Sequence, residues 1–337
     1  MTVSKRAATS AALAVVLGLG ALSPTLAQAC ACGCGVFDVG DGTLTPAMSP
    51  SGFTAWFRYG YMDQNRNWQG DASAPASDNT DKRIETHFFI VGGEYVINHR
   101  WTVMAELPLF DRSFHSLDDG TKFGPEGTPF TSRVTSLGDL QLTAMYTGLA
   151  PDMSTGLSLG VKLPTGDDVG PTGPLGGLTY DRDTLPGTGS TDLIFGAYHV
   201  GKVTGDGRLA WFVQARYQAA VATRDGYRPG NEFNSAVGLT YDLGRFGRIS
   251  KVAPILQLIN SQREHDSGGN SDPLNSGYER LLISPGIEVR SGRVRLNADV
   301  ALPVFQHVRS AASLAVADSV GQLVAPALVK VQLSYGF

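Results

Sequence analysis

Residues 327–337 alternate strictly between the two faces of an extended strand. The odd positions are apolar, the even positions from Lys330 to Ser334 are polar, and the last residue is the aromatic Phe337. The end of a soluble domain usually frays, whereas a closed barrel must pair its last strand with its first. A strand of about ten residues with one apolar and one polar face crosses a bilayer as a barrel stave. The pattern therefore predicts a transmembrane β-barrel.

Residues 1–29 have the organisation of a secretory signal peptide. Lys5 and Arg6 precede an apolar run over residues 11–22, and Ala27-Gln28-Ala29 supplies small residues for cleavage. The run is shorter than the roughly 20 apolar residues of a transmembrane helix, and no later stretch approaches that length. The mature chain is therefore either a soluble protein or a barrel.

Charge and composition narrow the class further. Without residues 1–29 the chain has 25 basic and 31 acidic side chains, a net charge of about −6, which argues against nucleic acid as a partner. The 41 glycines and a hydrophobic content of 42% fit many strands joined by turns better than a helical bundle.

Twelve segments of the mature chain show the period-two pattern of strands. The pattern predicts an all-β fold, an antiparallel transmembrane barrel of about 12 strands over residues 51–337, with one face of each strand against the lipid bilayer. The segments are 53–62, 83–96, 101–110, 137–148, 154–164, 190–200, 208–221, 232–243, 250–260, 278–290, 293–304 and 327–337.

The connections between these segments alternate between long and short. Barrels of the bacterial outer membrane have tight periplasmic turns and long extracellular loops, so the alternation predicts that both termini lie in the periplasm of a Gram-negative cell. A soluble sandwich has no reason to sort its loops in this way. The long connections are 63–82, 111–136, 165–189, 222–231, 261–277 and 305–326; the short ones are centred on 98–100, 151–152, 204–207, 244–247 and 291–292.

Aromatic side chains fit the same topology. Rings of Trp and Tyr favour the headgroup zone at the two edges of a bilayer. We expect Trp101, Trp211, Tyr241, Tyr335 and Phe337 at the periplasmic edge and Tyr59, Tyr61 and Phe110 at the extracellular edge.

Three motifs in the middle of the chain resemble a known family. They are Leu137-Gly138-Asp139-Leu140-Gln141-Leu142, residues 159–167 (LGVKLPTGD) and residues 187–192 (GTGSTD). They look like the outer-membrane family named for the meta-pathway of phenol degradation, most clearly over residues 100–245. The resemblance implies a porin-like channel for small solutes, often aromatic or hydrophobic. It carries no binding residues to positions of this chain.

The motifs also have a direct physical interpretation. Pro164 lacks an amide donor and Gly166 permits a bend, so a strand ends there, and Gly187 and Gly189 begin the next. We expect Asp139, Asp167 and Asp192 at the barrel rim, where their side chains hold loop turns by hydrogen bonds.

All three cysteines of the chain, Cys30, Cys32 and Cys34, lie in five residues at the start of the mature protein. Three converging thiolates suit a soft metal such as Cu(I) or Zn(II), or an iron-sulfur centre. Lipidation of Cys30 and a disulfide or intermolecular link are the alternatives. Residues 30–50 form a Cys-containing N-terminal segment, either a periplasmic tail that meets a periplasmic protein or metal carrier, or a partial plug of the lumen.

Charged residues on the predicted inward faces would line a channel of narrow bore, smaller than that of 16-stranded porins. Charges of both signs would set up a transverse field across the lumen; equally, they would form salt bridges that fill a lumen without conduction. The predicted lumen residues are Glu85, Glu106, Arg208, Arg216, Glu232, Glu288, Arg290, Arg293, Arg295, Asp299 and Lys330.

An enzymatic role is the third interpretation. Outer-membrane phospholipases are also barrels of twelve strands, with a Ser and a His on the lipid side. The six histidines of this chain fall in different strands or loops and no Ser-His pair is evident. We therefore expect no catalytic residues, and a channel or a display site for the cysteines instead.

Overall fold

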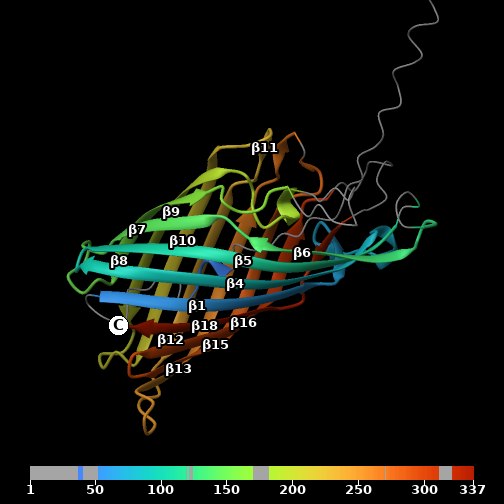
Figure 1. Ribbon diagram of the computed structural model, residues 1–337. Coiled ribbons are helices and arrows are strands. Elements are labelled where there is room, and N and C mark those ends of the chain that lie inside the picture. The colour runs from blue at the N-terminus through green and yellow to red at the C-terminus, as the bar shows by residue number, and fades with distance from the viewer. Residues whose placement is uncertain are drawn as a thin grey trace, which may run out of the picture.

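The computed structural model describes residues 37–40, 52–118, 120, 124–169, 182–269, 271–310 and 321–337. These residues form a closed antiparallel barrel whose strands run obliquely from one end to the other (Figure 1). β6 and β7 both pair with β5 and form one broken stave, so the wall has twelve staves, as the sequence predicts. The wall consists of β1 (Gly52–Gln64), β4 (Asp81–Asn98), β5 (Trp101–Leu117), β6 (Pro129–Leu137), β7 (Leu140–Tyr146), β8 (Thr155–Leu163), β9 (Thr191–Lys202), β10 (Leu209–Ala222), β12 (Glu232–Tyr241), β13 (Lys251–Arg263), β15 (Tyr278–Ser291), β16 (Val294–Val308) and β18 (Leu328–Gly336).

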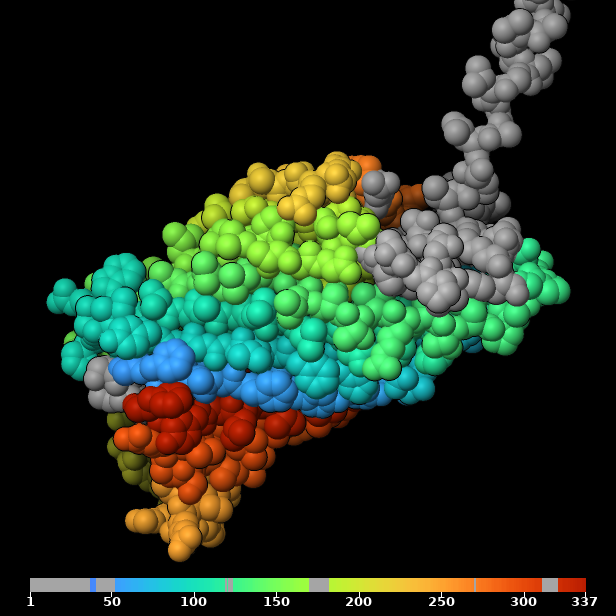
Figure 2. Space-filling view, viewed as in Figure 1, coloured from blue at the N-terminus to red at the C-terminus, as the bar shows by residue number. Residues whose placement is uncertain are grey.

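Pairing of β1 with β18 closes the wall. The register runs from Thr54 opposite Gly336 to Met62 opposite Leu328, and the amide of Phe337 donates a hydrogen bond of 2.9 Å to the carbonyl of Phe53. Figure 2 shows the first and last strands side by side on the outer surface. The terminal strand therefore occupies the place that its alternating pattern predicts.

The two faces of the wall differ in the sense expected for a barrel in lipid. Large apolar side chains such as Phe57, Leu159 and Leu333 are exposed on the outside, while Arg58 and Gln214 are buried inside. Because side chains alternate along a strand, this inside-out arrangement needs one apolar face and one polar face per strand. No helix in the described ranges is long and apolar enough to span a membrane.

The connections differ in length at the two ends of the barrel. At one end, here called the short-turn end, the connections between strands are short. β1 begins at this end and β18 ends there. The other end, here called the long-loop end, has long connections with small elements of their own. These are β2 (Arg66–Gln69), β3 (Ala72–Ser73), η2 (Ala76–Asp78), η3 (Arg182–Thr184), β11 (Tyr227–Arg228), β14 (Ser267–Gly268) and β17 (Gln322–Val324).

Aromatic residues gather on the outside of the short-turn end. Trp101, Tyr241, Tyr335 and Phe337 are exposed there, and the ring of Trp101 lies 5.0 Å from that of Tyr146. These positions match the predicted aromatic edge.

The prediction for Phe110 is wrong. Its ring is buried on the inside of β5, 5.2 Å from the ring of Phe88. The physical reason is that β5 continues to Leu117, well past the predicted end at 110, so Phe110 lies within the stave instead of at its edge.

Candidate functional site

Residues 37–40 lie inside the barrel, where four inward side chains hold them. Arg58 Nη1 donates to the carbonyl of Phe37 at 3.3 Å, and Lys330 Nζ donates to the carbonyl of Val39 at 3.0 Å. The amide of Gly40 donates to Gln214 Oε1 at 3.0 Å. Arg216 pairs with the carboxylate of Asp38. Residues 37–40, here called the plug segment, therefore occupy the lumen. Their position agrees with the prediction that part of the N-terminal segment plugs the barrel.

Apolar contacts add to these polar ones. Phe37 and Val39 are buried in the largest apolar cluster of the barrel interior. The Phe37 ring lies 4.8 Å from that of Phe88 and packs over Gly60, where a Cβ would lie 3.2 Å from a ring carbon of Phe37. The plug segment therefore presents two apolar side chains to an apolar part of the wall and one carboxylate to a guanidinium.

The three motifs of the family resemblance meet at one point inside the barrel. An ideal Cβ on Gly166 would lie 2.7 Å from the carbonyl carbon of Gly138 and 2.8 Å from Cα of Gly187. Only glycine allows three backbones to approach so closely. This contact, here called the glycine junction, lies where the stave breaks between β6 and β7 and where the chain leaves β8 and returns to β9.

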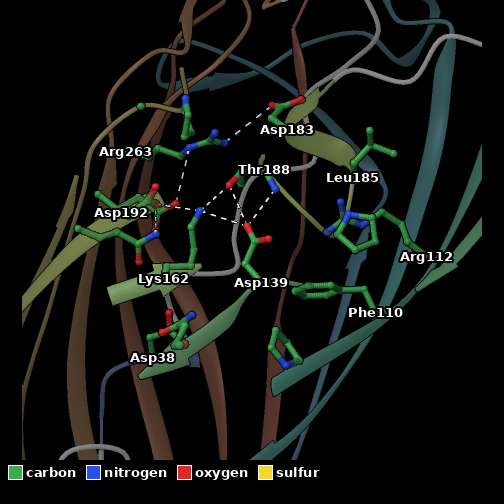
Figure 3. A pocket seen from close by; sticks show the side chains of 17 residues that line it. Asp38, Phe110, Arg112, Asp139, Lys162, Asp183, Leu185, Thr188, Asp192 and Arg263 are labelled. Atoms are coloured by element: carbon green, nitrogen blue, oxygen red, sulfur yellow. Dashed lines mark hydrogen bonds and ion pairs between the residues drawn. The ribbon is translucent and has the colours of Figure 1, made fainter. Parts of the chain in front are cut away.

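Asp139 ties the glycine junction together. Its Oδ1 accepts the amide of Gly166 at 2.9 Å, and its Oδ2 accepts the amide of Thr188 at 3.0 Å. Lys162 then lies between two carboxylates, 3.4 Å from Asp139 and 2.8 Å from Asp192. All three charged side chains are buried. The hydrogen-bonding role agrees with the prediction, but the position differs: Asp139 and Asp192 lie in the lumen, not at the rim, because the loop that follows β8 folds inward over them (Figure 3).

That inward loop is fixed by two cations of the wall, Arg112 and Arg263, and by Arg182 of the loop itself. Arg112 donates to the carbonyl of Thr184, and Arg263 lies 3.9 Å from the carboxylate of Asp183. Arg182 pairs with Asp168 at 3.0 Å, and its guanidinium lies 5.2 Å from the ring centre of Tyr227. The loop is therefore anchored to several strands at once.

Asp183 on this loop has an altered acidity. Burial raises the pKa of Asp183 to about 7, and the nearby carboxylate of Asp266 adds to the rise. Arg263 and Arg112 oppose it. The carboxyl group of Asp183 therefore gains or loses a proton near neutral pH while it sits above the cavity.

A cavity of about 110 Å³ separates the plug segment from the loop (Figure 3). Its lining is amphipathic. One side has the apolar residues Pro108, Phe110, Leu185 and Pro186 with Arg112 beside them; the other carries the Asp139, Lys162 and Asp192 cluster with Thr188, Gln218, Glu232 and Arg263. Two smaller cavities, of about 50 and 20 Å³, lie against Glu106 and Gln141. Asp38 borders all three cavities, so the plug segment interrupts the lumen where they meet.

Most of the predicted lumen residues have their side chains on the inward face, and each has an ionic partner nearby. Arg58 pairs with Glu106 at 3.2 Å and Lys330 with Asp299 at 3.5 Å. The inward residues are Glu106, Arg216, Glu232, Glu288, Arg290, Arg295, Asp299 and Lys330.

Three of the predicted residues lie elsewhere. Glu85 is on the outward face of β4, where it accepts a hydrogen bond from Tyr61 and pairs with Arg83 at 2.9 Å. Arg208 and Arg293 are exposed in short turns, and Arg208 lies over the ring of Tyr241 at 5.4 Å. The assignment of Glu85 fails because β4 is 18 residues long, more than the roughly ten that cross a bilayer, so its far end can carry charge on the outside.

The sequence interpretation missed several residues that form the site. Lys162 lies in the motif of residues 159–167 and Asp38 in the N-terminal segment. The sequence shows that both are charged, but it does not show that they line the same cavity. Arg58 interrupts a strand rich in aromatic residues, and a lone cation on the face opposite Phe57, Tyr59 and Tyr61 is the signal that could have found it. Arg112 shares its face with Phe110 and Phe114 and has no such signal.

Cys30, Cys32 and Cys34 lie outside the described residues. Within the described ranges, no group of His, Cys, Asp and Glu has a geometry that could hold a metal ion. Four imidazoles bond to other side chains: His87 to Tyr59, His115 to Thr131, His199 to Thr155 and His307 to Asp71. The metal and redox interpretations of the cysteines stay predictions.

The fold has a counterpart among solved structures. The crystal structure of an outer-membrane channel from Pseudomonas putida F1 aligns with a TM-score of 0.61 at 12% identity, over 89% of this chain and 99% of that one. At this identity the likeness concerns the fold alone, a closed antiparallel barrel in both proteins.

Two further alignments have lower scores. The β domain of the Bordetella autotransporter BrkA gives a TM-score of 0.46 at 12% identity, over 85% of this chain and 100% of that one. The CymD monoaromatic hydrocarbon channel gives 0.42 at 11% identity, over 86% and 89%. No family model and no curated protein matches the sequence, so membership of the phenol meta-pathway family stays a prediction.

Removal of Lys162 tests the buried charge cluster. Lys162→Met leaves the carboxylates of Asp139 and Asp192 without their shared cation, and we expect a loss of about 3–5 kcal/mol in the free energy of unfolding. The measurement is urea-induced unfolding in lipid or detergent, followed by tryptophan fluorescence. Arg133→Gln, which breaks an exposed pair with Asp111, is the matched control and should change stability little.

Asp183 should make stability depend on pH. Its raised pKa means that the folded state holds a proton that the unfolded state releases between about pH 4 and pH 7, so wild-type stability falls as pH rises through that window. The stability advantage of Asp183→Asn over the wild type should be about 2–3 kcal/mol larger at pH 8 than at pH 5. Unfolding at the two pH values checks this, with exposed Asp225→Asn as control; equal differences at both pH values would contradict it.

Proposed function

We propose that the chain is a channel of the bacterial outer membrane for small solutes, including aromatic and other apolar ones, in a closed conformation. The outward apolar face supports the placement in lipid, and the short-turn end with its aromatic residues then faces the periplasm. The first strand begins and the last strand ends at that end. The start and the end of the barrel therefore both lie in the periplasm in this proposal.

The plug segment is the observation on which the channel proposal depends. Cavities lie on both of its sides and Asp38 borders each of them. A lumen filled only for stability would not need a separate segment held by one ion pair and three hydrogen bonds. Displacement of residues 37–40 would join the cavities into a path, which is what a gated channel requires.

The lining of the cavity between the plug segment and the loop supports the solute class. An apolar cavity of about 150 Å³ can take up a benzene ring, and this cavity of about 110 Å³ approaches that size. Its apolar side suits the face of a ring, while the Gln218 amide, which uses one of its two protons for Asp192, can donate the other to a hydroxyl of the solute. The resemblance to the phenol meta-pathway family points to the same class of solute.

Weakening the hold on the plug segment should open the channel. Asp38→Asn removes the charge that Arg216 binds, while Arg216 keeps its bonds to Gln141 at 2.7 Å and Gln218 at 3.0 Å. A charge-assisted hydrogen bond contributes about 1.5–3 kcal/mol, so we expect the open population to rise roughly tenfold or more. Planar-bilayer conductance measures it.

The control is Asp152→Asn in a short turn, which should leave the conductance at the wild-type level. Liposome swelling with phenol and with a sugar of similar size tests solute passage in the same preparations. Absence of both conductance and solute uptake in the wild type and in Asp38→Asn would sink the channel proposal.

The cysteines support a second proposal, a metal or thiol site on the same chain. In sequence Cys34 stands three residues before Phe37 of the plug segment, so a ligand at the cysteines would act close to the residue that begins the plug. We expect bound copper, zinc or iron in the purified mature protein, lost when Cys30, Cys32 and Cys34 are changed to Ser. Elemental analysis decides, and metal-free wild-type protein would favour a disulfide or lipidation instead.

A further inference from the structure

Three cations converge on one carboxylate at the short-turn end of the lumen. Glu288 Oε1 lies 3.0 Å from Lys251 Nζ and 2.8 Å from Arg290 Nε, and Glu288 Oε2 lies 2.8 Å from Arg295 Nη2. All four side chains are on the inward faces of three neighbouring strands. The three cations outnumber this carboxylate, and Glu94 of β4, which interacts electrostatically with Arg295, reduces the positive excess of the cluster to one.

Part of this cluster is open to solvent. The side chains of Glu288 and Arg295 are 4% and 8% exposed, whereas those of Lys251 and Arg290 are 26% and 34% exposed. In the described part of the chain, Glu288 is the only side chain bonded to the Lys251 ammonium and to the Arg290 guanidinium. Lys251 thus keeps two ammonium protons, and Arg290 its Nη1 group, for a further acceptor.

The surroundings add to the positive charge. Residues 242–251 and 288–295 together contain six basic and two acidic side chains, in a chain whose overall charge is −4. Arg245, Arg248 and Arg293 in the two neighbouring turns contribute half of the basic ones. A concentration of one sign at the mouth of a low-dielectric channel raises the local concentration of the opposite ion, by tenfold or more in favourable cases.

We propose that the short-turn mouth contains a binding site for a small soluble anion, a carboxylate or a phosphate, formed by Lys251, Arg290 and Arg295 around Glu288. The inward direction of these side chains favours a dissolved anion over a phospholipid headgroup, which lies outside the wall. The role of this site in transport rests on the proposed channel function. In that channel, an anionic solute would bind here before it is released to the periplasm.

Binding can be measured without conduction. The full chain in zwitterionic detergent, at low ionic strength where exposed charges are screened little, is titrated into inorganic phosphate and the ³¹P line width is followed; acetate then competes. We expect Lys251→Gln/Arg290→Gln to weaken phosphate binding about tenfold or more. Lys251→Arg/Arg290→Lys, which keeps both charges, should bind as the wild type does.

The matched control is Arg100→Gln/Lys202→Gln, which removes two cations from other short turns and should leave binding unchanged. Circular dichroism checks that each variant is folded. If the double variant is unfolded, Lys251→Gln alone is tested in its place, and the loss of phosphate binding by the wild type in high salt is measured as well. Equal binding by folded Lys251→Gln and wild type would overturn the site.

Two other results separate the possible sources of the signal. Retention of phosphatidylglycerol in native mass spectrometry, without any response to soluble phosphate, would overturn the proposal in favour of a lipid site. Phosphate binding in a protein that neither conducts nor takes up solute would refute the channel and leave the anion site standing.

Discussion

Every backbone amide and carbonyl in a hydrocarbon layer needs a partner within the protein, because the layer contains no water. A sheet satisfies this condition only when it has no free edge, so the pairing of β1 with β18 is the interaction on which the rest of the structure depends. Closure divides each strand into an outward and an inward face. The outward face is apolar because it contacts lipid. The inward faces enclose a lumen, here called the chamber, in which polar and charged groups must find partners within the protein.

The chamber achieves this balance with ion pairs and with a piece of the chain itself. Lys162 between Asp139 and Asp192 shows the first solution, and Arg58 and Lys330, which donate to carbonyls of residues 37–40, show the second. A buried charge without a partner costs several kcal/mol, so the plug segment satisfies wall cations as well as filling space. Moving it would expose those cations, which makes the closed state a defined conformation and not a loose obstruction.

The sequence was sufficient for the wall because period-two alternation and loop length are local properties. For Glu85 the face was misassigned because β4 extends beyond the apolar layer. For Phe110 the alternation itself is obeyed, since Phe110 shares the inward face of β5 with Glu106; the error was to place it by the expected end of the strand. The site could be predicted only in part. The motifs around Asp139, Gly166 and Thr188 were recognisable, but their meeting depends on how the wall curves, and nothing near Asp38 in sequence indicates Arg216, 178 positions away.

The register that places Thr54 opposite Gly336 also bears on how the chain folds. The two partners lie almost a full chain length apart, and contacts of such high sequence separation form slowly. The entropy of closing a loop grows only with the logarithm of its length, so delay, more than thermodynamic penalty, is the consequence of this long-range pairing. An assembling sheet keeps two unsatisfied edges until its last strand arrives, and in that interval residues 37–40 can enter from the side instead of being threaded through a finished ring.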